Sequence, residues 1–429
     1  MDVIVLGLML LSLTIWLGLL GFWGQFWRTD QQLEFTETQL ESLPVVCAVV
    51  PARNEAQLLP TTLRSLLLQD YPGSFNVFLV DDRSTDRTAN FAEGVAHAVG
   101  KAQQLHIISG ESLPAGWSGK LWAIEQGIKS ASLFAPDYFL LTDADIEHDS
   151  GNLRRLVAKA VQEDLDLVSV MVRLRCESFW EKFLIPAFIF FFQKLYPFRW
   201  VNNPNNPTAG AAGGSILIAR EALERIGGIQ VIRQALIDDC ALAKAVKKSR
   251  GAGEQGSRGA GEQRSREAGE QGSKGYKENN HAPYPMPSQG RIWLGLSSLT
   301  HSLRPYDSLA TIWDMVARTA YTQLNYSPLI LLGTLVGMPL IYLAPPVCVI
   351  MGAVWSNWAI AFTGLLGWLL MTFAYYPTIR FYKCSPWLAL SLPAIAFLYT
   401  LMTLDSALRH WQGRGGAWKG RVYSSPDKL

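Results

Sequence analysis

The stretch DYFLLTDADIEH, residues 137–148, places two carboxylates, Asp143 and Asp145, directly after an apolar run. The run predicts a β-strand, so the aspartates lie where that strand ends. Carboxylate oxygens that converge from one tight turn suit Mg²⁺ or Mn²⁺, which also retain waters and phosphate oxygens. The pair therefore predicts a divalent-cation site, although a D-x-D on its own is far more often a solvated turn with an aspartate cap.

Strands and helices alternate around this stretch. Strands are expected in VVCAVVPARNE (45–55), FNVFLVDD (75–82) and LHIIS (105–109), with helices in AQLLPTTLRSLLLQD (56–70) and around KLWAIEQGI (120–128). This alternation predicts an α/β domain with a mostly parallel sheet, whose ligands bind at the carboxyl ends of the strands. Both acidic clusters, Asp81-Asp82 and Asp143-Asp145, fall at such ends.

The composition indicates a membrane protein with a sizeable water-facing part. The 429 residues are 49% hydrophobic and have a mean hydropathy of +0.12, which is too apolar for a purely soluble enzyme. The 38 basic and 36 acidic residues give a net charge of only +2 without any basic block. This balance argues against a nucleic-acid partner.

Four apolar stretches approach the length of about 20 residues that a bilayer-crossing helix needs. They are Val3–Phe26, Pro328–Met351, Ala353–Tyr376 and Pro386–Leu404. The first has neither a basic n-region nor a cleavage site, so residues 1–27 are interpreted as a retained anchor. Residues 328–406 are interpreted as C-terminal membrane segments, with an interfacial helix region at 301–327 and a basic tail at 407–429.

The distribution of basic residues favours a cytoplasmic catalytic domain. Arg28 follows the first span, and no basic residue precedes it. The basic tail also favours a cytoplasmic position. Three full C-terminal crossings would instead place this tail on the outer side. Because Pro386 and Pro393 interrupt the last stretch, a re-entrant or interfacial element is expected there. The sequence thus predicts a multi-pass membrane protein of the bacterial inner-membrane type.

Two further segments have unusual compositions. Residues 251–274 contain three copies of an eight-residue repeat beginning GAGEQGSR, and residues 249–289 are expected to form a disordered insertion without a function of its own. The aromatic segment 178–200 is flanked by basic residues and predicts a helix at the membrane interface; a buried core helix is the alternative.

Neither the cysteines nor the histidines predict a metal site. The five cysteines have no C-x-x-C spacing, so neither a zinc site nor a disulfide framework is indicated. The six histidines form no spaced pair and are expected to be structural or exposed. A cation site therefore depends on the carboxylates.

An ordered set of motifs resembles the family-2 glycosyltransferases. The motifs are PARNEA (51–56), VDDRSTDRT (80–88), SGK (118–120), DAD (143–145), AAGGSILIAR (211–220) and LIDDCALAKAV (236–246). The resemblance covers residues 44–300 and implies a GT-A nucleotide-diphospho-sugar transferase domain. Further segments, including GWSGKLWA (116–123) and RTAYTQLNYSPL (318–329), look like the hopene-associated glycosyltransferases of hopanoid biosynthesis.

The resemblance implies a role for each matching donor-side position. Pro51, Arg53 and Glu55 would line the nucleotide pocket. Asp81 and Asp82 would contact the base or ribose, and Lys120 would lie near the donor. Asp143 would hold the sugar, and Asp143 and Asp145 the metal on the diphosphate.

On the acceptor side, the resemblance implies that Gly213 and Gly214 shape the site. It also assigns a catalytic pair to Asp238 and Asp239, with Asp239 in the position of the general base. Three departures stand out: Asp238 replaces a glutamate, Ala241 replaces an acidic residue, and no Q-x-x-R-W stretch is present. The last departure argues for transfer of one sugar, although Arg318 and Gln323 offer a related pair.

The chemistry of the residues supports sugar transfer independently. A hydroxyl is a poor nucleophile near neutral pH, so a carboxylate such as Asp239 should assist by general-base catalysis. With one base and no second nucleophile, direct displacement inverts the sugar. The alternative is that Asp238 and Asp239 only complement the dipole of the following helix.

The sequence therefore predicts a membrane-anchored inverting glycosyltransferase. It would move one sugar from a nucleotide donor, expected to be UDP-linked, to a lipid hydroxyl with a divalent cation as cofactor. The resemblance implies a hopanoid or related isoprenoid acceptor. The alternatives are synthesis of a polysaccharide or a glycosylated polyprenyl phosphate, and a catalytically silent scaffold that binds nucleotide or lipid.

Overall fold

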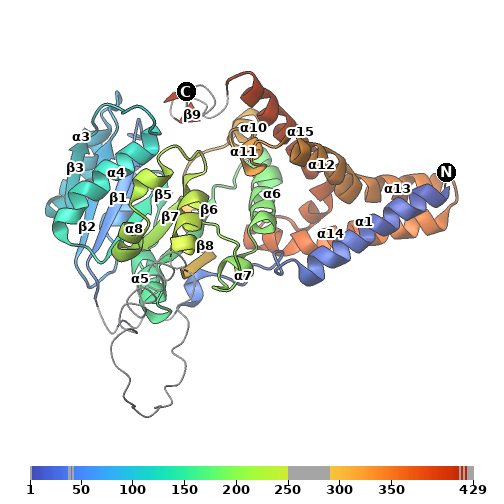
Figure 1. The fold of residues 1–429 in the computed structure, drawn as a ribbon, viewed down its shortest axis with the longest axis horizontal. Helices are drawn as coiled ribbons and strands as arrows, with labels where there is room; N and C mark the ends of the chain where they lie inside the picture. The colour runs from blue at the N-terminus through green and yellow to red at the C-terminus, as the bar shows by residue number, and fades with distance from the viewer. Residues whose placement is uncertain are drawn as a thin grey trace, which may run out of the picture.

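An eight-stranded sheet forms one side of the molecule and long apolar helices form the other (Figure 1). This computed structural model describes residues 2–36, 40, 43–249, 290–414, 417–418 and 421–422. The predicted disordered insertion, apart from residue 249, lies outside these residues, as do residues 415–416, 419–420 and 423–429 of the basic tail. The strands are β1 Val46–Ala52, β2 Phe75–Asp81, β3 Leu105–Ser109, β4 Tyr138–Thr142, β5 Ile146–Glu147, β6 Leu167–Leu174, β7 Ser215–Ala219 and β8 Ile292–Ser302.

The sheet is mixed but mostly parallel, with the order β3-β2-β1-β4-β7-β6-β8-β5. β3, β2, β1 and β4 are parallel, and β8 is parallel to β6; β7 is antiparallel to both its neighbours. Val46 of β1 is level with Phe75 of β2 and with Tyr138 of β4. The carboxyl ends of these three strands therefore meet at one edge, which confirms the α/β prediction.

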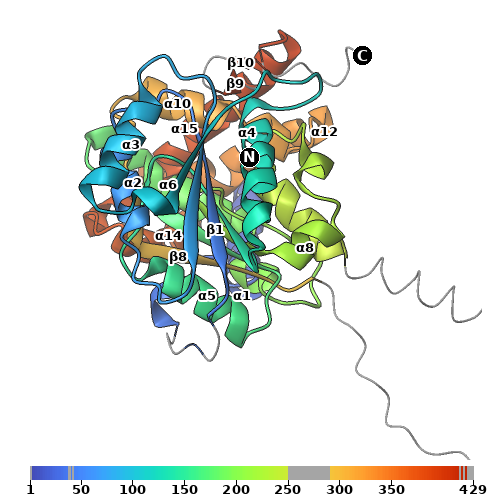
Figure 2. The ribbon, with the colours of Figure 1, turned by 90° about the vertical axis from the view of Figure 1, so that its left-hand side faces the viewer.

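The two faces of the sheet carry different helices, because side chains alternate along each strand. Val46, Ala48 and Val50 pack on the side of α2 Leu59–Leu67, α3 Thr88–Ala98 and α5 Asn152–Gln162. Cys47 and Val49 face the side of α4 Gly119–Ala131, α8 Arg220–Arg225 and the helix of residues 238–249. Figure 2 shows α2 and α3 on one side of β1, and α4 and α8 on the other.

The aromatic segment forms α6 Phe179–Leu195, which joins the sheet to the C-terminal helices. Leu184, Ile185, Ala187 and Phe190 are fully buried, and they share a core with residues of the sheet and of the C-terminal helices. The middle of α6 is therefore a core helix, and the prediction of an interfacial helix is wrong for it. Short helices complete this region: α7 Phe198–Val201, α10 Leu309–Ala317 and α11 Ala320–Gln323.

Four helical segments are long and apolar enough to cross a membrane: Asp2–Phe22, Pro328–Val354, Trp358–Phe381 and Pro386–Trp411. The first is α1, and the second comprises α12 Pro328–Met338, a π-helical turn at Pro339–Leu343 and α13 Ala344–Val354. The third is α14, and the fourth joins a 3₁₀ turn, Pro386–Ser391, to α15 Leu392–Trp411. α1, α13 and α14 extend together away from the sheet (Figure 1).

Pro386 and Pro393 do not break the last of these segments. Each lies in the first turn of its helical element, where a missing N–H removes no intrahelical bond. The segment is therefore long enough to span a bilayer, although a re-entrant or interfacial element was expected. The topology of this end stays a prediction.

Residues 249 and 290 lie at neighbouring points on the edge of the sheet remote from the carboxyl ends of β1, β2 and β4. The amide of Gly290 donates a hydrogen bond of 3.3 Å to the carbonyl oxygen of Lys247. The chain leaves helix 238–249 and begins β8 from this point.

Candidate active site

Most of the predicted site residues converge at the carboxyl ends of β1, β2 and β4. Arg53 follows β1, Asp82 follows β2, and Asp143 follows β4. Because β7 is antiparallel to β4 and begins where β4 ends, the turn at Gly213 lies beside Asp143. The sheet thus gathers donor-side and acceptor-side residues at one edge.

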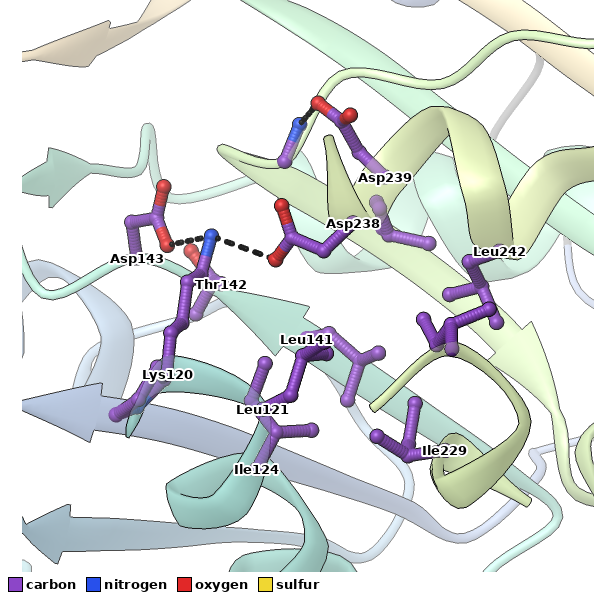
Figure 3. A pocket seen from close by; sticks show the side chains of 14 residues that line it. Lys120, Leu121, Ile124, Leu141, Thr142, Asp143, Ile229, Asp238, Asp239 and Leu242 are labelled. Atoms are coloured by element: carbon purple, nitrogen blue, oxygen red, sulfur yellow. Dashed lines mark hydrogen bonds and ion pairs between the residues drawn. The ribbon is translucent and has the colours of Figure 1, made fainter. Parts of the chain in front are cut away.

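Lys120, in the first turn of α4, connects the two acidic motifs (Figure 3). Its Nζ lies 2.8 Å from Oδ1 of Asp143 and 3.2 Å from Oδ2 of Asp238. Burial alone would lower the pKa of Lys120, but the two carboxylates more than offset this effect and raise it. The ammonium group therefore stays charged and balances part of the negative charge of the cluster.

Asp239 lies next to this ion pair, at the start of helix 238–249. Its Oδ2 accepts a 2.8 Å hydrogen bond from the amide of Gly213, and its Oδ1 accepts one of 2.7 Å from the amide of Cys240. Burial and the adjacent charge of Asp238 raise the pKa of Asp239 to about 6. Because Gly213 lies outside the helix, Asp239 does more than complement the helix dipole.

A second ionic cluster surrounds Asp145. Oδ2 of Asp145 accepts hydrogen bonds from Oγ of Ser302 at 2.7 Å and from Nε of Arg304 at 3.3 Å. Nη2 of Arg304 also donates to Oε1 of Glu55 at 2.7 Å. Glu55 follows β1, Asp145 follows β4, and Arg304 follows β8, the strand that Ser302 ends. One guanidinium thus bridges two predicted donor-site carboxylates.

Asp81 and Asp82 have separate structural partners. The buried Asp82 lies beside Arg53. Nη1 of Arg53 is 3.6 Å from Oδ2 of Asp82 and donates a 2.6 Å hydrogen bond to the carbonyl oxygen of Asp82. Oδ1 of Asp81 accepts a 3.0 Å hydrogen bond from the amide of Ser84. These bonds fix the two loops in which a nucleotide base would bind; contact with a base or ribose stays a prediction.

A pocket between α4, β4 and helix 238–249 has a polar rim and an apolar floor (Figure 3). Six predicted site residues line it: Pro51, Lys120, Asp143, Gly213, Asp238 and Asp239. The floor consists of leucine and isoleucine side chains: Leu121, Ile124, Leu141, Ile216, Ile229, Ile232 and Leu242. The remaining predicted residues do not line this pocket: Arg53, Glu55, Asp81, Asp82, Asp145 and Gly214.

Gly214 is required by packing. A Cβ atom there would lie 2.9 Å from Cγ2 of Val172, which is too close for an undistorted sheet. At Gly213 a Cβ atom would lie 3.4 Å from both Asp239 and Lys120, which is an ordinary contact distance. Gly213 therefore acts through its amide, and Gly214 through its size.

The donor chemistry of the aspartates fits a divalent cation that arrives with a nucleotide. Among the residues that the structure describes, no three histidine, cysteine or acidic side chains are grouped to hold a metal ion. Asp143 and Asp145 nevertheless offer hard oxygens, and Mg²⁺ is commonly held by one or two carboxylates together with waters and substrate phosphates. Such a cation must share or displace Lys120 at Asp143 and Arg304 at Asp145.

Two residues without an assignment from the sequence also belong to this region. Arg304 carries no recognisable motif, and only the fold reveals its contacts. Tyr196, at the end of α6, donates a 2.7 Å hydrogen bond from its hydroxyl to Oε1 of Gln323 and lies near Asp239. This bond connects the environment of Asp239 to α11, which precedes the apolar helices.

His148 is buried between Thr142 and Asn152, as expected for a structural histidine.

Comparison with known proteins relates the domain that carries this site to glycosyltransferases. Residues 47–227 match the family model described as glycosyl transferase family 2. An undecaprenyl-phosphate 4-deoxy-4-formamido-L-arabinose transferase of an Enterobacter species is 30% identical over 34% of this chain and 42% of its own length. A beta-monoglucosyldiacylglycerol synthase of a Nostoc species is 28% identical over 33% of this chain and 29% of its own length. The chain thus spans less than half the length of these curated relatives.

Among solved structures, a mannosyltransferase of Pyrobaculum calidifontis covers 95% of this chain and 99% of its own, at 16% identity and a TM-score of 0.48. This likeness is too low to support an argument about function. The family match covers β1 to β7 of the sheet, whereas β8 lies beyond it. Residues 47–227 thus match the glycosyl transferase family 2 model, and the chain has the GT-A fold with a mostly parallel sheet, together with apolar helices long enough to cross a membrane.

Proposed function

We propose that this protein is a membrane-bound inverting glycosyltransferase that moves one sugar from a nucleotide donor to a lipid hydroxyl. The observation that supports this most is the joint position of Asp143, Lys120 and Asp239 in one pocket. A donor-side aspartate and a carboxylate suited to act as a base are thereby separated by one lysine. The apolar helices are long enough to hold the protein in a membrane, where a lipid acceptor lies.

Asp239 is the proposed general base. Each oxygen of its carboxylate accepts one amide hydrogen bond and keeps a second lone pair, which can accept the proton of the acceptor hydroxyl. The hydroxyl oxygen then bonds to the anomeric carbon while the bond to the diphosphate breaks and its electron pair leaves with the diphosphate. Attack opposite the leaving group inverts the anomeric centre. General-base assistance of this kind contributes typically about 10²–10⁴-fold.

Positive charge at the site would stabilise the departing nucleoside diphosphate. Asp145 and Asp143 would hold a divalent cation, which supplies Lewis-acid stabilisation of the diphosphate when bound. Lys120 contributes a fixed ammonium between Asp143 and Asp238. We infer that the donor is a UDP-sugar whose base binds between the loops that hold Arg53 and Asp81.

The acceptor is proposed to be a hopanoid or related polycyclic isoprenoid with a free hydroxyl. The names of two relatives support a lipid-related acceptor, since one concerns undecaprenyl phosphate and the other a glucosyldiacylglycerol. The contact of Tyr196 with Gln323 links the pocket to the helical region, through which a lipid would approach. The basic residue Arg28 after α1 supports a multi-pass protein with its catalytic domain in the cytoplasm.

A polyprenyl phosphate acceptor is the second candidate, because the undecaprenyl-phosphate transferase is among the relatives. In that case a phosphate oxygen, which needs no deprotonation at neutral pH, would attack the sugar. The dependence on Asp239 therefore separates the two acceptors. A hydroxyl acceptor requires the base, whereas a phosphate acceptor does not.

The test is nucleoside diphosphate release by purified protein in lipid bilayers. A panel of nucleotide sugars is supplied with Mn²⁺ and with a hydroxylated hopanoid, diacylglycerol or undecaprenyl phosphate. We expect release with one donor and the hopanoid, formation of an inverted anomer by NMR, and loss of about 10²–10⁴-fold in Asp239→Asn. Asp70→Asn is the matched control, because Asp70 is exposed and ion-pairs only with Arg154 among the described residues.

The outcomes distinguish the candidates. Turnover with undecaprenyl phosphate that survives Asp239→Asn would support the phosphate acceptor. Donor binding without turnover with any acceptor would favour the silent scaffold. Turnover with the hopanoid at the wild-type rate in Asp239→Asn would refute the assignment of the base.

A further inference from the structure

Arg304 occupies a position that neither the family match nor the sequence motifs assign. It follows β8, outside the matched residues 47–227, and its side chain crosses to the ends of β1 and β4. There it contacts Oε1 of Glu55 at 2.7 Å and Oδ2 of Asp145 at 3.3 Å. Both carboxylate residues are more than nine-tenths buried, whereas the side chain of Arg304 is 31% exposed.

The flanking residues hold the backbone of Arg304 on both sides. Ser302 donates to Oδ2 of Asp145, and the amide of Tyr306 donates a 2.8 Å hydrogen bond to Oε1 of the buried Glu181. With the backbone anchored, the long side chain is the part that can change position. An arginine in this place can therefore exchange ionic partners without rebuilding the sheet.

The guanidinium lies where it neutralises Asp145, the carboxylate that the proposed function assigns to the cation. Two positive groups cannot share one carboxylate at close range without repulsion. A divalent cation at Asp145 would therefore displace Arg304 toward solvent. Arg304 would keep Glu55 as one anionic partner. The diphosphate of the donor, which arginine binds well through its planar fork of N–H donors, would replace Asp145 as the second.

We propose that Arg304 competes with the divalent cation for Asp145 and transfers its ionic contact to the donor diphosphate when the cation binds. This inference rests on the proposed function. Arg304 acts as a positioning residue that weakens cation binding to the empty site and strengthens it once nucleotide is present. The cation and the nucleotide then promote each other's binding, and this coupling is reciprocal by linkage.

The test measures Mn²⁺ binding directly, without sugar transfer. Full-length protein in lipid nanodiscs is titrated with Mn²⁺ by electron paramagnetic resonance of the free ion, with and without saturating UDP. Wild type is compared with Arg304→Gln and Arg304→Lys. Arg291→Gln is the control, because Arg291 precedes the same strand at its opposite end and pairs with Asp164.

In Arg304→Gln, we expect Mn²⁺ to bind the UDP-free protein about three- to tenfold more tightly, and UDP to bind about three- to tenfold more weakly in the presence of Mn²⁺. The effect of UDP on Mn²⁺ affinity should shrink correspondingly. Arg304→Lys should keep most of the wild-type Mn²⁺ affinity, since it retains the charge. Arg291→Gln should match wild type in every titration.

Unchanged or weaker Mn²⁺ binding by UDP-free Arg304→Gln would overturn the proposal, provided that the variant elutes and unfolds like wild type. A lack of Mn²⁺ binding to any form would also overturn it, because Arg304 would then have nothing to compete with. A failure of this kind is distinct from failure of the proposed function. Acceptor-dependent release of nucleoside diphosphate, with the expected loss in Asp239→Asn, would leave the enzyme assignment intact.

Discussion

The sulfur atoms of Cys176 and Cys384 lie 3.7 Å apart, although 208 residues separate them in the sequence. Cys176 lies between β6 and α6, and Cys384 lies between α14 and the last apolar segment. The backbone oxygen of Tyr382, two residues before Cys384, also accepts a 2.9 Å hydrogen bond from Nη2 of Arg173. The sheet and the apolar helices therefore meet at a defined junction.

This proximity predicts that the two thiols form a disulfide when an oxidant is supplied. Copper phenanthroline would remove two electrons and two protons, and closing the gap to about 2.05 Å requires only a small movement. Mass spectrometry of unreduced peptides would detect the cross-link, and Cys176→Ser would abolish it. Persistent free thiols at both positions under conditions that oxidise accessible cysteine pairs would contradict the junction.

The raised pKa of Asp239 predicts an acidic limb in the pH profile. Since the proposed base must be ionised, kcat/KM should fall about tenfold per pH unit below the pKa of about 6. For stability the sign is opposite: the favourable contribution of the protonated carboxyl is present below about 4 and is lost as the pH rises through about 6. A profile that is flat between pH 5 and pH 7, with chemistry rate-limiting, would exclude Asp239 as the base.

Replacing Asp238 with asparagine should shift this limb to lower pH. Asp238 is a neighbouring like charge, and its removal makes ionisation of Asp239 easier. The expected displacement is about half a unit to one unit, measured as the pKa in the pH dependence of kcat/KM. A shift in the opposite direction would show that loss of the Lys120 contact outweighs the relief of repulsion.

Lys120→Met should shift the same limb to higher pH and lower the free energy of unfolding. It removes the ammonium group that Asp143 and Asp238 share, and leaves three acidic side chains close together. Because the ion pairs are partly exposed, we expect a loss of about 1–3 kcal/mol. Thermal unfolding in detergent measures the loss, and Lys129→Met, in the last turn of the same helix, is the control. Equal stability of the two variants would contradict the stabilising role of Lys120.

Lys247→Met should reduce activity, although Lys247 does not line the pocket. The buried ammonium of Lys247 donates to the carbonyl oxygens of Val201, Asn203 and Thr208, and so ties the segment that leads to Gly213 onto the helix of Asp239. Unpaired buried carbonyls should lower the free energy of unfolding by about 1–3 kcal/mol. Lys244→Met, exposed on the same helix, is the matched control for unfolding and kcat. Wild-type kcat in Lys247→Met would show that this tie is dispensable.

The sequence contains enough information to predict the strands and the edge at which the aspartates gather. The apolar runs ending in Asp81 and Asp143 mark strand ends, and parallel strands bring such ends together. The role of Arg304 could not be predicted from the sequence. Its partners Glu55 and Asp145 are 249 and 159 residues away in the sequence, and the contacts depend on how β8 enters the sheet. For a related reason the sequence favoured an interfacial helix for α6 and left a buried core helix as the alternative: an aromatic helix looks the same in sequence whether it covers lipid or another helix.

The adjacent positions of residues 249 and 290 have a practical consequence. Residues 249 and 290 lie at the start of β8. This strand of 11 residues runs roughly 35 Å to Ser302, so the two residues are remote from the carboxylates. A rigid, folded protein whose own termini lie close together can be joined at this point in place of residues 250–289. Such a chimera would carry a fiducial for electron microscopy on a protein of 47.6 kDa, at the end of β8 remote from the donor site.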